Sequence, residues 1–132
     1  MSTSFRFRVH DERLAIARLP QTAAFPAWAQ GRFVHLARTP DEVSIVCAQV
    51  HVPADVQQER DKIALGIEGV IPMTTVGILA ALCGALAKET VPVFALSTYD
   101  TDWLLVSAAR FDDARRALES AGHSVIGTLP AR

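Results

Sequence analysis

The stretch Val93–Val106, VFALSTYDTDWLLV, decides the fold expected for this chain. Its apolar ends, Val93–Leu96 and Trp103–Val106, flank a polar run, Ser97–Asp102. Two β-rich runs around a short polar cluster predict an antiparallel hairpin. The polar run is longer than a turn alone requires. We therefore expect its carboxylates and hydroxyl groups to gather at one edge of a packed sheet.

A simpler hairpin occurs sixty residues earlier, where Phe33–Leu36 aligns with Val93–Leu96 and Thr39–Glu42 aligns with Tyr99–Asp102. Such self-similarity indicates an internal repeat. Upstream of the two hairpins the spacing differs by eight residues, about two helical turns. The second copy is therefore expected to carry a full helix where the first copy has a truncated one.

The remaining elements are predicted from the periodicity of apolar residues and from residues that start or end helices and strands. Further strands are expected at Phe5–Val9, Leu14–Leu19, Phe33–Arg38, Val43–Val50, Ile63–Ile71 and Ser124–Leu129. A helix capped by Thr74 or Thr75 should run to about Lys88 because apolar residues recur there at three- and four-residue spacing. A second helix should span Phe111–Ala121, with Gly122 just beyond its end. Short helical segments are expected at Thr22–Trp28 and Pro53–Arg60.

The second half thus has the order strand, helix, strand, strand, helix, strand of ferredoxin-like folds. The predicted fold class is α+β, with two tandem βαββαβ units, antiparallel sheets and helices on one face. The units are expected at residues 1–62 and 63–132, the first with truncated helices. We expect the strand Phe5–Val9 to fill the fourth-strand position of the first unit.

The composition of the chain argues against several classes of function. The chain has 132 residues, half of them apolar, and a formal net charge of −1 without a basic block, which argues against nucleic acid as a partner. Cys47 and Cys83 lie far apart in apolar patterns, as buried free thiols do. The longest apolar run, Val76–Ala87, is too short to span a bilayer, and the first residues lack a signal-peptide core. A cytoplasmic protein without a membrane partner is expected.

Four segments carry a resemblance to a known family: Phe25–Ala29, Arg38–Cys47, Glu68–Gly69 with Thr75–Leu79, and Ser97–Asp102. Over about residues 14–126 the sequence resembles small bacterial proteins made of two tandem ACT domains. It is also similar to the ACT repeats of the cytosolic arginine sensor and, more distantly, to the regulatory domains of aspartate kinases. This resemblance implies a non-catalytic module that binds a free amino acid at an interface between ACT units.

The resemblance also implies which residues make the contacts. The candidate ligand-binding residues are Thr74, Thr75, Val76, Gly77, Ile78, Ser97, Thr98, Asp100 and Asp102. No cofactor, catalytic residue or metal ligand is implied, and a homodimer or higher homo-oligomer is expected. The first unit departs from the pattern at its truncated helix and at the turn Thr39–Glu42, which puts a second site there in doubt.

The types of residue at these positions are suited to binding a zwitterion. A zwitterion needs an anion site and a cation site close together. The unpaired N–H groups and the dipole at a helix start near Thr75–Gly77 offer the first, and Asp102 or Asp100 offers the second. Gly77 lacks a Cβ, so the ligand backbone can approach closely.

Structural roles for the same residues stay open. The threonines fit a helix cap, Gly77 fits helix–sheet packing, Ser97 and Thr98 fit strand-end hydrogen bonding, and Asp100 fits a turn. A ligand-free dimerisation module is the main alternative. An enzyme built on Cys47 and His35, or a metal held by His51 and His123, has less support because no catalytic motif spacing occurs.

Overall fold

The computed structural model describes residues 3–132, which divide into two compact units. The first, here called the helical unit, comprises residues 3–10 and 63–129. The second, here called the small unit, comprises residues 11–62 and 130–132. The long strand β5 (Gln57–Ile67) contributes its end to the helical unit and its beginning to the small unit.

The helical unit has five strands and two α-helices among its described residues. They are β1 (Arg6–Val9), the end of β5, α1 (Ile78–Lys88), β6 (Phe94–Ser97), β7 (Asp102–Ser107), α2 (Phe111–Ser120) and β8 (Ser124–Ile126). The strand order is β6-β7-β5-β1-β8, with β1 antiparallel to β5 and parallel to β8. A one-turn 3₁₀ helix (Ala108–Arg110) leads from β7 into α2.

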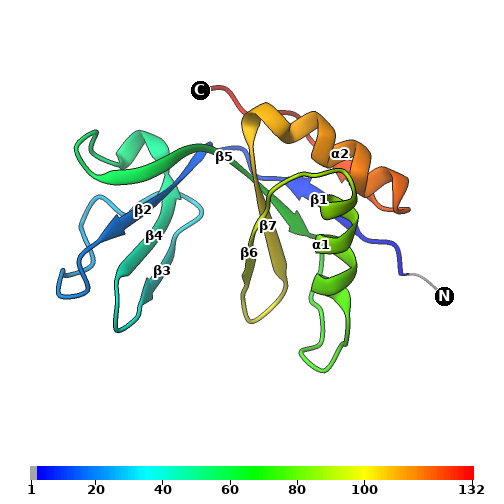
Figure 1. Ribbon diagram of the computed structural model, residues 1–132, viewed down its shortest axis with the longest axis horizontal. Coiled ribbons are helices and arrows are strands. Elements are labelled where there is room, and N and C mark those ends of the chain that lie inside the picture. The colour runs from blue at the N-terminus through cyan, green and yellow to red at the C-terminus, as the bar shows by residue number, and fades with distance from the viewer. Residues whose placement is uncertain (1–2) are drawn as a thin grey trace. The chain divides into compact units, whose positions relative to one another are not determined.

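Both helices lie side by side on one face of this sheet (Figure 1, green and orange ribbons). That face is built by strand alternation. Leu65 of β5 and Leu104 of β7 point to the helices and are fully buried with Leu82, Leu86 and Leu118. This single apolar core holds the helical unit together.

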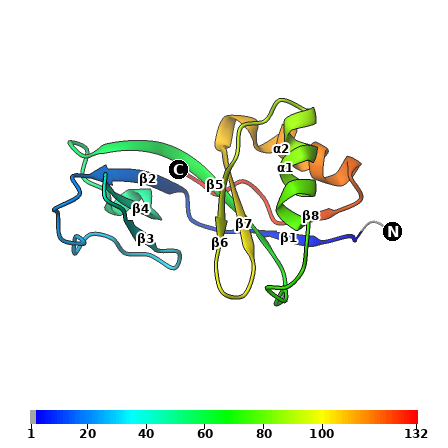
Figure 2. The ribbon, with the colours of Figure 1, turned by 60° about the horizontal axis from the view of Figure 1, so that its bottom comes forward.

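The N-terminal strand lies in a different place from the one predicted. β1 pairs with β5 through Phe7↔Ile67 and with β8 through Phe7↔Val125, so it belongs to the helical unit. Figure 2 shows β1 running beside β8. The predicted placement of Phe5–Val9 in the first unit is therefore wrong. β1 is inserted between the two strands that a four-stranded ferredoxin-like sheet would pair directly.

The small unit is an antiparallel sheet of β2 (Leu14–Leu19), β3 (His35–Arg38), β4 (Val43–Ala48) and the beginning of β5, in the order β3-β4-β2-β5. In chain order this is the 4-1-3-2 arrangement of a ferredoxin-like unit. Loop residues 20–34 and a 3₁₀ turn, η1 (Gln49–His51), occupy the positions of its two helices. The predicted α+β class with truncated helices in the first unit is confirmed.

Two short helices predicted in this region do not form. Residues 22–28 hold only turns and irregular backbone, and Trp28 packs on the small core of Ala17, Ile45 and Cys47. Residues 57–60 lie in β5 and pair with β2 through Arg18↔Gln57. Pairing with a neighbouring strand overrides the weak local preference for a helix there.

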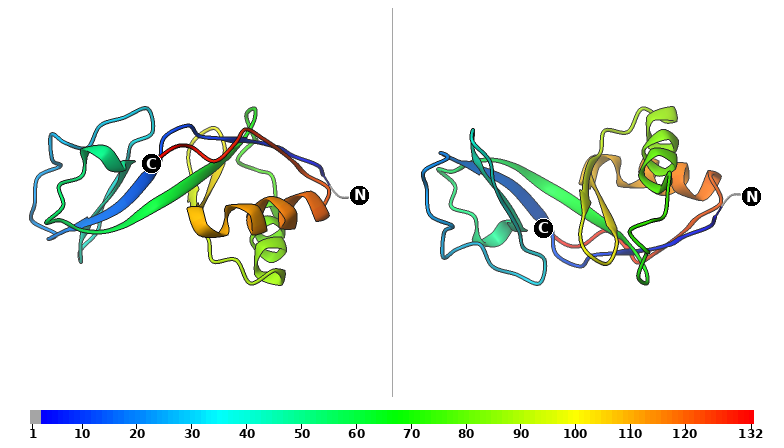
Figure 3. Two further views of the ribbon diagram at one scale, coloured as in Figure 1. Left: turned by 90° about the horizontal axis from the view of Figure 1, so that it is seen from above. Right: turned by 90° about the horizontal axis from the view of Figure 1, so that it is seen from below.

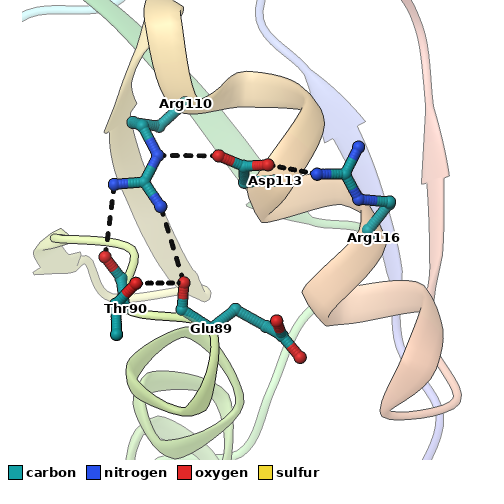
Figure 4. A network of polar contacts seen from close by, with 5 residues as sticks. All are labelled: Glu89, Thr90, Arg110, Asp113 and Arg116. Carbon is teal, nitrogen blue, oxygen red and sulfur yellow. Dashed lines mark hydrogen bonds and ion pairs between the residues drawn. The ribbon is translucent and has the colours of Figure 1, made fainter.

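The connection between the helices of the helical unit is polar. The Arg110 guanidinium donates to the carbonyl oxygens of Thr90 at 3.3 Å and Glu89 at 3.5 Å, just beyond the end of α1 (Figure 4). Its Nε donates to Asp113 of α2 at 2.7 Å, and Arg116 pairs with the same carboxylate. Arg110 therefore caps one helix while holding the first turn of the other. The two views of Figure 3 show the resulting pair of neighbouring helices.

Among residues 3–132, no helix is both long enough and apolar enough to cross a bilayer.

Candidate functional site

The helix α1 begins later than predicted, with its N-cap two residues beyond Thr75 and three beyond Thr74. Its N-cap is Gly77, with φ 87°, and no side chain caps the helix end. The first bond inside the helix runs from the Ala81 N–H to the Gly77 carbonyl at 3.0 Å. The N–H groups of Ile78, Leu79 and Ala80 therefore have no acceptor within the helix, which leaves a cluster of donors at its positive end.

The acidic hairpin presents a carboxylate to the same region. A four-residue turn, closed by the Thr98 N–H donating to the Thr101 carbonyl at 2.8 Å, places Ser97 opposite Asp102. The Ser97 hydroxyl donates to Asp102 Oδ1 at 2.7 Å. Asp102 lies two residues before Leu104, so it shares the face of the sheet that carries the helices.

Two hydrogen bonds hold the segment before α1 against this turn. The Ile71 N–H donates to the Asp100 carbonyl at 2.7 Å. The Thr101 hydroxyl donates to the Ile67 carbonyl at 3.2 Å. The loop that leads into α1 is thus fixed to the hairpin at its base.

A cavity of about 470 Å³, here called the hairpin cavity, lies between these segments. It is lined by Ile71, Pro72, Met73, Thr75, Gly77, Ile78, Leu79, Ala80, Ser97, Thr98, Tyr99, Thr101 and Asp102. Its size falls in the range of roughly 300–1,000 Å³ that is common for ligand pockets. The helix start and the acidic hairpin therefore face one open space.

Six of the nine candidate residues meet at this cavity: Thr75, Gly77, Ile78, Ser97, Thr98 and Asp102. Thr74, Val76 and Asp100 do not line it. Val76 is 93% exposed, and Asp100 contributes its backbone carbonyl to the loop contact. Sequence reasoning missed Leu79 and Ala80, although Gly77 as the last residue before the helix would have placed both in the first turn.

A second cavity of about 530 Å³, here called the histidine cavity, shares the wall formed by Ile71, Pro72, Thr75, Gly77 and Ile78. Its ionisable side chains are Glu68 and His123. Glu68 is already engaged by Arg6 and Arg8, so its charge is balanced within the chain. The hairpin cavity, with Asp102 beside free helix donors, is the better match for a zwitterion.

His123 sits in a defined environment at the edge of the histidine cavity. Its Nδ1 accepts from the Phe5 N–H at 2.9 Å, and its ring stacks on Phe5 and meets Phe7 edge-on. The accepting Nδ1 assigns the proton to Nε2 in the neutral ring. Burial lowers the pKa of His123 below its ordinary value of 6.5.

We expect this histidine to make folding sensitive to acid. Because its pKa is lower in the folded chain, the unfolded chain binds the extra proton first, and the free energy of unfolding falls as pH drops below about 6.5. Protonation would also turn Nδ1 into a donor facing the Phe5 N–H. Melting curves between pH 7.5 and 5.5 should show this loss. His123→Asn, whose side-chain oxygen takes the position of Nδ1 and does not titrate, should lose less, whereas exposed His51→Asn should behave like wild type. Equal losses in wild type and His123→Asn would contradict the assignment.

The hairpin of the small unit does not repeat the site. There the four-residue turn is closed by the Thr39 N–H donating to the Glu42 carbonyl, and Arg38 pairs with Val43. The pair Arg38↔Val43 thus occupies the position of Ser97↔Asp102. The structural repeat is therefore 59 residues, and the predicted alignment at sixty is wrong by one. The residue at the position of Asp102 is a fully buried valine, Val43, which offers no carboxylate.

The residues weighed for an enzyme lie apart. His35 pairs across the strands with Val46, so Cys47 points to the opposite face of the sheet. Burial raises the pKa of the Cys47 thiol, which disfavours the thiolate. Within residues 3–132, no group of three or more His, Cys, Asp and Glu side chains is arranged to hold a metal ion.

Two family models match the chain, and they divide it close to the boundary between its two units. A model of the ACT domain matches residues 57–120, which include α1, the acidic hairpin and α2. A model of an N-terminal domain matches residues 12–55. No curated protein is significantly similar to the chain in sequence.

The solved structures with a similar fold include the following three. The protein Atu0741 from Agobacterium tumefaciens is 30% identical over 99% of each chain, with a TM-score of 0.91. VC0802 from Vibrio cholerae, described as a protein of unknown function and possible transport protein, is 16% identical over 89% of this chain and 90% of its own, with a TM-score of 0.70. The ligand-free regulatory subunit of aspartate kinase from Thermus thermophilus is 14% identical over 86% and 97% of the two chains, with a TM-score of 0.59.

The ACT match covers the elements that build the hairpin cavity, and the likeness to Atu0741 extends over the whole chain. The chain therefore belongs to the ACT-domain family.

Proposed function

We propose that the protein is a regulatory module that binds a free amino acid in the hairpin cavity. The observation that carries this proposal is that a carboxylate and the positive end of a helix dipole line the same cavity. Asp102 lies on one wall, and the donors of Ile78, Leu79 and Ala80 lie on the other. An α-ammonium group suits the carboxylate, and an α-carboxylate suits the helix start.

The hydrogen bond from Ser97 supports this role for Asp102. It occupies one side of Oδ1 and orients the carboxylate, which leaves Oδ2 to accept from a ligand. Charge-assisted hydrogen bonds contribute roughly 1.5–3 kcal/mol each. Two or three of them, less the cost of ordering, correspond to affinities on the order of micromolar to millimolar. Such affinities suit the sensing of amino-acid pools.

Self-association is part of the proposal, because two large side chains of the hairpin cavity are strongly exposed. Met73 and Tyr99 line the cavity and are 71% and 82% exposed. A second copy that covers these side chains would also close the cavity over its ligand. A dimerisation module that takes no ligand is the alternative that the same observation favours.

A thermal-shift screen of the twenty amino acids separates these two functions. Binding to the folded state raises stability by about 2.7 kcal/mol at a ligand concentration of one hundred times Kd. We expect at least one amino acid to raise the melting temperature in a concentration-dependent way. No shift with any amino acid, in a protein that remains a stable dimer by light scattering, would support the dimerisation module instead.

A further inference from the structure

The charges around the hairpin cavity restrict the ligand. Among the described residues that line it, Asp102 is the only carboxylate, and no lysine, arginine or histidine is present. Once Asp102 pairs with an α-ammonium group, a basic ligand side chain would have no carboxylate to meet. An acidic side chain would have no cation. Either charge would lose hydration without compensation.

The apolar part of the lining has a half-buried floor and an exposed edge. Ile71, Ile78 and Leu79 are half-buried and pack on the core of the helical unit. Met73 lines the same cavity but is 71% exposed, so its unbranched side chain is free to adapt to a ligand. These four side chains offer an apolar surface beside the proposed site of the ligand backbone.

The hydroxyl groups of the hairpin do not call for a polar ligand side chain, because three of them already donate within the chain. Ser97 donates to Asp102, Thr98 donates to the Thr101 carbonyl at 3.2 Å, and Thr101 donates to the Ile67 carbonyl. A ligand hydroxyl or amide group that bonded to Ser97, Thr98 or Thr101 as an acceptor would therefore compete with bonds that hold the turn together.

We infer that the hairpin cavity selects a neutral amino acid with an apolar side chain, of the leucine, isoleucine, methionine or phenylalanine type. This inference rests on the proposed function and adds the class of ligand. Transfer of such a side chain from water to the floor of Ile71, Ile78 and Leu79 supplies the selectivity. Asp102 and the start of α1 supply the affinity that all amino acids share.

Titration calorimetry of the whole chain with leucine, methionine, phenylalanine, serine, glutamate, lysine and arginine tests the inference. We expect the three apolar amino acids to bind roughly tenfold or more tightly than the other four. Tightest binding of serine or of a charged amino acid would overturn the inference and leave the proposed function standing. Failure of all seven to bind would overturn the inference, and the screen of all twenty amino acids would then decide the proposed function.

A matched pair of variants tests the same point within the cavity. Met73→Glu places a second carboxylate at the edge, so the affinity for leucine should fall and the affinity for lysine should rise about threefold. Val70→Glu is the control, because Val70 is also 71% exposed but lines the histidine cavity. It should leave the ranking of ligands unchanged. An unchanged ranking in Met73→Glu as well would overturn the role assigned to this lining.

Discussion

Replacement of Asp102 by asparagine is expected to weaken amino-acid binding by about 10- to 150-fold, the equivalent of one charge-assisted hydrogen bond. The amide keeps an oxygen that accepts from Ser97, so the hairpin should keep its shape. It removes the negative charge that faces the ligand ammonium group. Calorimetric titration would measure the change in Kd, and circular dichroism would show that the fold is retained.

Asp100→Asn is the matched control for this variant. Asp100 lies in the same turn and is exposed, but it acts through its backbone carbonyl, which the substitution preserves. Its binding should equal that of wild type. If Asp100→Asn and Asp102→Asn weakened binding equally, the effect would come from the general negative charge of the turn. If neither changed it, Asp102 would not be a ligand contact.

Gly66→Ala should destabilise the helical unit by about 3 kcal/mol, the upper part of the usual range for overpacking. A Cβ at this position would lie 2.5 Å from Cζ3 of Trp103 and 2.7 Å from two further ring carbons. The indole of Trp103 on β7 lies directly over the β5 backbone, so the ring or one of the two strands must shift. Denaturant unfolding would measure the loss of free energy.

Two comparisons make this test specific. Gly84→Ala, in the middle of α1, meets no atom within 4 Å and should stabilise by about 0.5–1 kcal/mol. In a Trp103→Leu background, Gly66→Ala should cost far less than it does in wild type, because the clash has been removed. An equal cost in both backgrounds would show that the backbone, and not Trp103, makes Gly66 necessary.

Elements with strong local signals were predictable. The helix α2 lies at Phe111–Ser120 as expected, because the apolar stripe, the early acidic residues and Gly122 with φ 96° all agree. The hairpin of β6 and β7 was equally clear from its two apolar runs. The polar turn between them was predicted too, although Asp102 lies at the end of β7, which pairs on both sides, and not on an edge strand.

Features that depend on distant parts of the chain were not predictable. The alternating pattern of Phe5–Val9 shows that this strand is half-buried, but not that β5 and β8 are its partners. The start of α1 was misplaced because the apolar spacing extends back to Val76, whereas the backbone turns at Gly77. The slip of one residue in the repeat paired Val43 with Trp103, which lies on the opposite face from Asp102.

The most direct measurement is an amide chemical-shift titration of the isotope-labelled chain with leucine. We expect saturating shifts that are largest at Ile78, Leu79 and Ala80 and at Ser97 and Asp102, because both ends of the ligand bind there. Shifts confined to Glu68 and His123 of the histidine cavity or to residues 11–62, or no shifts at all, would contradict amino-acid binding in the hairpin cavity.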